Sequence, residues 1–131
     1  MTGRSPPKLS DLTGLTILVV DDNAEFVDFL ATFMKACGAK PLAARSAIQA
    51  FAHIDTTPTL DVIVTDLAMP HMDGVEFARK VRGHGTRHSV PVVALTGFYE
   101  DYPNAKHFDG YLRKPVDVDE LGRVIRSLTR R

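Results

Sequence analysis

Residues 16–22 read Thr-Ile-Leu-Val-Val-Asp-Asp, so that five apolar or β-branched residues run directly into two carboxylates. A strand with one wet face alternates apolar and polar side chains, whereas a strand covered on both faces is apolar throughout. This stretch is of the second kind, which occurs in parallel sheets that carry helices on both sides. It therefore predicts an α/β fold, with Asp21 and Asp22 at the carboxyl end of a buried strand.

Four more short runs rich in apolar or β-branched residues follow along the chain, at residues 41–44, 61–66, 90–96 and 110–113. Segments with helical periodicity lie at about residues 25–37, 47–53, 75–81 and 117–131. Strands that alternate with helices are typical of βαβ units. The pattern predicts one doubly wound, five-stranded parallel sheet.

The composition of the chain narrows its possible functions. Its 131 residues suit one domain, and 16 basic and 16 acidic side chains give a formal net charge of zero. Nucleic-acid binding needs a clustered basic surplus, so we expect no nucleic-acid partner. The longest apolar runs are far below the roughly 20 residues of a membrane span, so we expect no membrane segment. The single cysteine excludes a disulfide framework.

The beginning of the chain differs from the rest. Residues 1–11 contain a pair of prolines and few apolar side chains, which predicts a flexible arm ahead of a domain at residues 12–131. No apolar stretch follows Arg4 and Lys8, so the segment does not resemble a secretory signal. We therefore expect a cytoplasmic protein without a separate effector domain.

Polar side chains gather where the predicted strands end: Asp21 and Asp22 after the first, Asp66 and Thr96 on the third and fourth, and Lys114 after the fifth. The carboxyl ends of neighbouring parallel strands meet at one crevice, so these groups should converge there. Two like charges about 4 Å apart cost on the order of 4 kcal/mol at an effective dielectric near 20, so we expect a bound cation. Oxygen ligands without a thiolate favour Mg²⁺.

Such a cluster is suited to phosphoryl chemistry. With its charge partly neutralised by Mg²⁺, one carboxylate can attack phosphorus and become an aspartyl phosphate. We expect Lys114 to pair with the phosphoryl oxygens and the Thr96 hydroxyl to donate a hydrogen bond to one of them. Catalysis would then consist of positioning and charge neutralisation.

Four separate motifs of the chain resemble the signature blocks of the response regulator receiver domain. They occur in the order and at about the spacing of that family, at Val19–Asn23, Val64–Gly74, Ala94–Gly97 and Tyr111–Pro115. The resemblance covers about residues 15–128 and implies the flavodoxin-like strand order 2-1-3-4-5. It also implies Asp66 as the phosphoacceptor. Asp22 would bind Mg²⁺ directly and Asp21 through water, with the backbone carbonyl of Ala68 as a further ligand.

The motifs of the last two strands match the family with one departure. Thr96 and Tyr111 match its switch pair, and the resemblance implies a cis bond between Lys114 and Pro115. From Thr96 to Lys114 is 18 positions, about four fewer than is usual in the family, so roughly one helical turn is missing. We therefore expect a shortened or irregular helix in residues 98–108, on a face that the family commonly uses for output.

The resemblance implies a stand-alone phosphoacceptor of a two-component system or phosphorelay. A histidine kinase or a histidine phosphotransfer protein would supply the phosphoryl group to Asp66, and changed protein contacts would carry the signal. The chain would not be an enzyme with a separate substrate, although it would assist its own Mg²⁺-dependent phosphorylation and dephosphorylation.

Three other functions stay open at this point. Residues 11–15 resemble the joint before receivers in hybrid kinases, so the chain could be a phosphate shuttle or sink beside such a kinase. An aspartyl-nucleophile phosphatase would share Asp66 and Mg²⁺, but such enzymes usually carry a second aspartate where this chain has Ala68. A receiver-shaped module that is never phosphorylated is expected to lack an acidic or lysine site residue, and this chain has them all.

Overall fold

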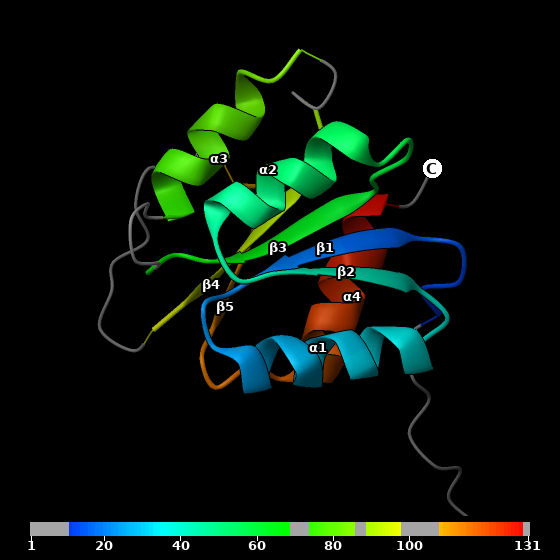
Figure 1. Ribbon diagram of the computed structural model, residues 1–131. Coiled ribbons are helices and arrows are strands. Elements are labelled where there is room, and N and C mark those ends of the chain that lie inside the picture. The colour runs from blue at the N-terminus through cyan, green and yellow to red at the C-terminus, as the bar shows by residue number, and fades with distance from the viewer. Residues whose placement is uncertain (1–10, 69–73, 86–88, 98–107, 130–131) are drawn as a thin grey trace, which may run out of the picture.

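The structure, a computed structural model, describes residues 11–68, 74–85, 89–97 and 108–129 (Figure 1). The strands in these ranges are β1 (Thr16–Val20), β2 (Lys40–Ala44), β3 (Val62–Asp66), β4 (Val92–Thr96) and β5 (Gly110–Arg113). The helices are α1 (Ala24–Ala36), α2 (Ala47–Thr56), α3 (Gly74–Arg82) and α4 (Val118–Thr129). None of these helices combines the length and the apolar character that crossing a membrane requires.

The five strands form one parallel sheet in the order β2-β1-β3-β4-β5, which confirms the predicted fold class and strand order. β4 begins at Val92, two residues later than predicted. Pro91, just before it, has no N–H to donate to a neighbouring strand. The shortened helix was predicted within a segment of which residues 98–107 lie outside the described part of the chain.

The sheet is covered by helices on both faces, as the apolar character of its strands predicts (Figure 1). Leu18 and Val20 of β1 pack into the core beneath α2 and α3. Ile17 and Val19 point to the opposite face and pack into the core beneath α1 and α4. All four side chains have no exposed surface, so β1 is buried on both faces, as residues 16–22 indicated.

Local chemistry sets the ends of the helices. α1 begins where the Asn23 side chain accepts a hydrogen bond from the backbone N–H of Phe26 at 2.9 Å. It ends before Gly38, whose φ of 93° is a left-handed conformation that glycine adopts without strain. α4 begins after Asp117, whose carboxylate accepts from the backbone N–H of Glu120 at 3.2 Å, as expected for a helix cap.

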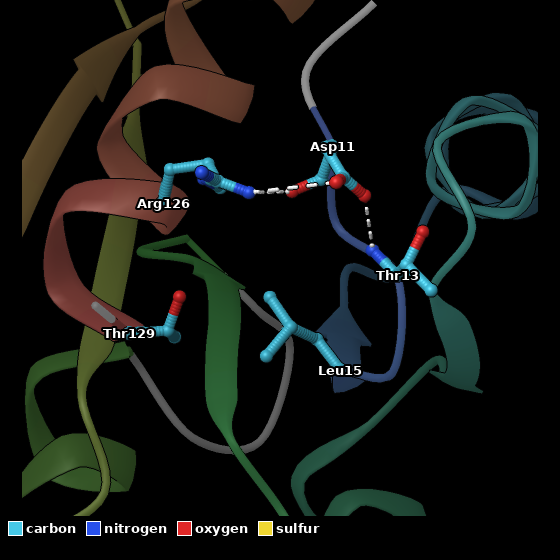
Figure 2. Close-up of a pocket in the computed structure, with 5 residues that line it drawn as sticks. All are labelled: Asp11, Thr13, Leu15, Arg126 and Thr129. Atoms are coloured by element: carbon cyan, nitrogen blue, oxygen red, sulfur yellow. Dashed lines mark hydrogen bonds and ion pairs between the residues drawn. The ribbon is translucent and has the colours of Figure 1, made fainter. Parts of the chain in front are cut away.

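The segment that leads into β1 is held against the C-terminal helix. Leu12 is fully buried, and the guanidinium of Arg126 donates to the backbone carbonyl of Asp11 at 2.6 Å. A pocket of about 230 Å³ lies beside this contact and is also lined by Thr13, Leu15 and Thr129. Figure 2 shows these lining residues. Leu15 precedes β1 and Thr129 ends α4, so this pocket lies at the amino ends of the strands, at the opposite edge of the sheet from the predicted site.

Candidate functional site

Three carboxylates meet at the edge of the sheet where β1 and β3 end. Asp21 and Asp22 follow β1, and Asp66 is the last residue of β3. The two strands pair in parallel, with Val20 opposite Thr65, so the residues that follow emerge side by side. One oxygen of each carboxylate lies within 4.8 Å of the others. Asp21 and Asp66 are buried, at 1% and 7% exposure, and Asp22 is exposed.

The ammonium of Lys114 lies against two of these carboxylates. Its Nζ atom is 2.9 Å from Asp21 Oδ2 and 3.4 Å from Asp66 Oδ1. The backbone N–H of Lys114 donates to the carbonyl of Thr96 at 2.7 Å, which ties the residue to the end of β4. The bond between Lys114 and Pro115 is cis, as the resemblance implied. The expected lysine is therefore in place, although it lies 93 positions after Asp21 in the sequence.

The turn after β1 fixes Asp21 and leaves Asp22 toward solvent. Asp21 Oδ1 accepts a hydrogen bond from the backbone N–H of Asn23 at 2.9 Å, while its other oxygen accepts from Lys114. Both oxygens of this buried carboxylate thus have a donor, which is what burial of a charged group requires. Asp22 is exposed and can take part in binding of a solvated ion.

Burial and neighbouring charges both shift the pKa values of Asp66 and Lys114. Burial raises the pKa of the Asp66 carboxyl; Lys114 opposes that rise and Asp21 adds to it, and the pKa stays above its ordinary value. Burial lowers the pKa of Lys114, but its hydrogen bond to Asp21 and the charge of Asp66 outweigh this, so the net shift is upward. Lys114 thus stays charged at neutral pH and is the counter-ion of the cluster.

The donor set fits a magnesium ion. In the described part of the chain, Asp21, Asp22 and Asp66 are the acidic cluster close enough to share one ion. All of its ligand atoms are oxygens, as Mg²⁺ prefers, and the exposure of Asp22 leaves space for the waters that Mg²⁺ retains. Among the described residues, the three carboxylates and the Lys114 ammonium together carry a formal charge of two negative units, which a divalent cation would balance. Mg²⁺ bound here would neutralise charge and orient a phosphoryl oxygen.

The remaining predicted site residues lie around this cluster. Thr96 is fully buried, and its hydroxyl donates to the carbonyl of Gly97 at 3.3 Å. Tyr111 lies opposite Ala94, two residues before Thr96, so the side chains of Thr96 and Tyr111 are on the same face of the sheet. The Tyr111 ring is half-buried and packs 5.4 Å, centroid to centroid, from Phe108. Their role as a switch pair stays a prediction.

The chain that follows β3 stays close to Asp66, the candidate phosphoacceptor. The backbone N–H of Ala68 bonds to the Asp66 carboxyl and lowers its pKa, against the larger effect of burial. Whether the carbonyl of Ala68 binds a metal stays a prediction. Gly74, which begins α3, donates its N–H to the carbonyl of Leu67 at 2.7 Å. A Cβ atom on Gly74 would lie 2.5 Å from the carbonyl oxygen of Asp66.

We expect Gly74→Ala to destabilise the domain and to disturb the Asp66 end of β3. The added Cβ would overlap backbone atoms of Asp66 and Leu67, which cannot rotate away as a side-chain tip can. Overpacking of this kind costs about 1–3 kcal/mol in the free energy of unfolding, measured by urea denaturation. Gly85→Ala is the control, because a Cβ there meets no atom within 4 Å. Equal stability of the two variants would contradict the close approach.

One contact of this site could not be predicted from the sequence. The ring of Phe26 lies 4.7 Å from the Nζ atom of Lys114, measured to the ring centroid. The sequence shows Phe26 as one of several apolar residues on the buried side of α1, and nothing in the helical period distinguishes it from the others. Only the position of β5 in the sheet brings Lys114 over this residue.

Comparisons with known proteins agree with the fold described above. The family model described as "Response regulator receiver domain" matches residues 17–126. An uncharacterized 14.6 kDa protein in the sodA1 3′ region of Leptolyngbya boryana is 36% identical over 124 residues, which cover 91% of this chain and 93% of that protein. The receiver domain of the Francisella response regulator 1452 has a similar structure, with a TM-score of 0.78, 28% identity and coverage of 88% and 97% of the two chains.

A second relative is a much longer protein. Histidine kinase 3 of Arabidopsis thaliana is 30% identical over 152 residues, which cover 93% of this chain but 14% of the kinase. The chain thus corresponds to a small part of that relative and to nearly the whole of the Leptolyngbya protein. The same domain therefore occurs both in short chains and inside larger kinases.

Proposed function

Because this chain belongs to the family of response regulator receiver domains, we propose that it accepts a phosphoryl group on Asp66 and signals through changed protein contacts. The observation that supports this most directly is the position of Lys114, whose ammonium lies between Asp21 and Asp66. The site thereby brings together the nucleophilic oxygen of Asp66, the positive charge of Lys114 and two further carboxylates suited to Mg²⁺.

In the proposed reaction a carboxylate oxygen of Asp66 attacks the phosphorus of the donor. The new bond joins Oδ of Asp66 to phosphorus, and the bond from phosphorus to the donor nitrogen or oxygen breaks. The leaving group keeps the electron pair of that bond. Lys114 would pair with the phosphoryl oxygens, and the Thr96 hydroxyl would donate to one of them. The protein mainly positions the groups and balances charge.

The donor would be a histidine kinase or a histidine phosphotransfer protein. The match to Histidine kinase 3 supports this donor, because in that relative the same type of domain lies within a kinase chain. A cytoplasmic site of action is part of this proposal. Membership of the receiver-domain family supports it, because receiver domains are typically cytoplasmic.

A phosphate shuttle or sink that works beside a hybrid kinase is the second candidate. The observation that favours it is the kinase similarity, where the matched segment makes up 14% of the relative. The same reaction on Asp66 serves both functions, so they differ in the fate of the phosphoryl group. A shuttle passes it back to a histidine of a phosphotransfer protein, whereas a terminal regulator binds a target.

Incubation with acetyl phosphate and Mg²⁺, followed by intact mass measurement, tests the proposal. We expect the wild-type protein to gain the mass of one phosphoryl group and to lose it in hydroxylamine, which cleaves acyl phosphates. Asp66→Asn should gain none, because an amide is a poor nucleophile. Equal labelling of Asp66→Asn, or no labelling of the wild type, would contradict the proposal.

The same preparation separates receiver from phosphatase. A phosphatase would release phosphate continuously from a simple phosphomonoester such as p-nitrophenyl phosphate. We expect no such turnover, because Ala68 offers no acid or base group two residues after Asp66. Sustained hydrolysis that Asp66→Asn abolishes would favour the phosphatase instead.

A further inference from the structure

The ammonium of Lys114 has an aromatic ring as well as two carboxylates around it. Nζ lies 4.7 Å above the ring of Phe26, 2.9 Å from Asp21 and 3.4 Å from Asp66. A cation within about 6 Å of a ring centroid is attracted by the negative face of the ring. The Lys114 side chain is 31% exposed, so water screens this attraction only in part.

The backbone of Phe26 is fixed by the turn that carries Asp21 and Asp22. Asp21 Oδ1 accepts from the Asn23 N–H, and Asn23 Oδ1 accepts from the Phe26 N–H, each at 2.9 Å. Phe26 is half-buried and packs against the core beneath α1 and α4. The contacts therefore form a closed circuit, from Asp21 through Asn23 and Phe26 to Lys114 and back to Asp21.

We propose that Phe26 is a positioning residue that holds the Lys114 ammonium at the junction of Asp21 and Asp66, where an incoming phosphoryl group needs it. The consequence for phosphoryl transfer rests on the proposed function of Asp66. A ring attracts a cation without competing for it as a metal ligand. Asp21 and Asp66, in contrast, have to share their oxygens between Lys114 and a divalent ion. The ring thus keeps its hold on Lys114 when these carboxylates turn to the metal.

The first measurement is the rate of phosphorylation by acetyl phosphate with saturating Mg²⁺. A small donor needs no docking surface, so a change in rate does not reflect altered binding of a partner protein. We expect Phe26→Leu to react about fivefold more slowly, the factor for loss of a partly screened cation–π contact. Phe26→Tyr should keep nearly the wild-type rate because it keeps the aromatic face. Tyr also keeps the volume of the Phe ring, so the NMR measurement below, which packing alone does not change, separates attraction to Lys114 from packing.

Phe29→Leu is the matched control. Phe29 lies one turn further along the same helix and is 53% exposed, so its truncation should leave the rate at the wild-type value. A wild-type rate for Phe26→Leu, or a rate for Phe26→Tyr as low as that of Phe26→Leu, would overturn the proposal. Circular dichroism and urea denaturation of each variant establish that the compared proteins are folded.

The second measurement does not depend on phosphorylation. In NMR spectra the ε-methylene protons of Lys114 should be shifted upfield by the Phe26 ring current in the wild type and in Phe29→Leu. The shift should disappear in Phe26→Leu. If the wild type takes no phosphoryl group, the proposed function fails while this shift still decides whether Phe26 holds Lys114. An unshifted Lys114 signal in the wild type would overturn the positioning proposal by itself.

Discussion

Lys114→Met should lower the free energy of unfolding without Mg²⁺ by about 3 kcal/mol, because it removes the counter-ion of two buried carboxylates. Loss of one partner of a buried ion pair costs about 3–5 kcal/mol. We expect a value at the lower end of this range because the Lys114 side chain is 31% exposed, so that water partly screens the ion pair. The total free energy of unfolding of a domain of this kind is about 5–15 kcal/mol, so a loss of this size is large. Urea denaturation in the presence of a chelator measures it.

Mg²⁺ should restore much of this loss. A ligand at a hundredfold excess over its Kd stabilises the folded state by about 2.7 kcal/mol. In Lys114→Met the ammonium that lies against Asp21 and Asp66 no longer competes with the metal, so the stabilisation by Mg²⁺ should exceed that of the wild type. Lys80→Met, on an exposed position of α3, is the control and should shift stability by less than about 0.5 kcal/mol. A Lys114→Met protein as stable as this control would contradict the role of Lys114 as counter-ion.

Asp66→Asn should have the opposite effect on the protein without metal. Burial raises the pKa of the Asp66 carboxyl, and Asp21 adds to that rise while Lys114 opposes it. The folded state therefore binds a proton at Asp66 more tightly than the unfolded chain, and ionisation at neutral pH costs stability. A neutral amide of the same shape avoids this cost, so we expect a gain of about 1 kcal/mol in the free energy of unfolding near pH 7.

The response of Asp66→Asn to Mg²⁺ tests whether Asp66 contributes to the metal site. The variant lacks one of the three carboxylates that share the site, so Mg²⁺ should stabilise it far less than the wild type. Thermal unfolding with and without Mg²⁺ measures both shifts. Asp28→Asn, an exposed change on α1, should respond like the wild type. Equal shifts by Mg²⁺ in Asp66→Asn and the wild type would show that Asp66 does not contribute to the metal site.

The strands were predictable because their signal is local. Every residue of Thr16–Val20 is apolar or β-branched, and such a run indicates a strand buried on both faces whatever the rest of the chain does. Two boundaries were predicted less accurately. α2 continues to Thr56 instead of ending near residue 53, and β4 begins after Pro91 because that residue has no N–H to donate.

The residues of the candidate site were predictable because they lie at the ends of strands. In a parallel sheet every strand ends at the same edge, so Asp21, Asp22, Asp66 and Lys114 had to approach one another once the strand order was right. The sequence suggested an acidic site strained by repulsion when no metal is bound. The structure modifies this, because Lys114 already balances part of the charge through its contacts with Asp21 and Asp66.

The sequence by itself determined the residue types at the strand ends and the order of the elements that carry them, because periodicity and strand-end chemistry are properties of neighbouring residues. Only the tertiary structure decided which atoms meet: Lys114 with Asp21 across 93 positions, the Phe26 ring beneath that ammonium, and Gly74 against the backbone of Asp66. Such contacts depend on strand register and on how α1 packs against the sheet, and these are fixed when the whole core closes.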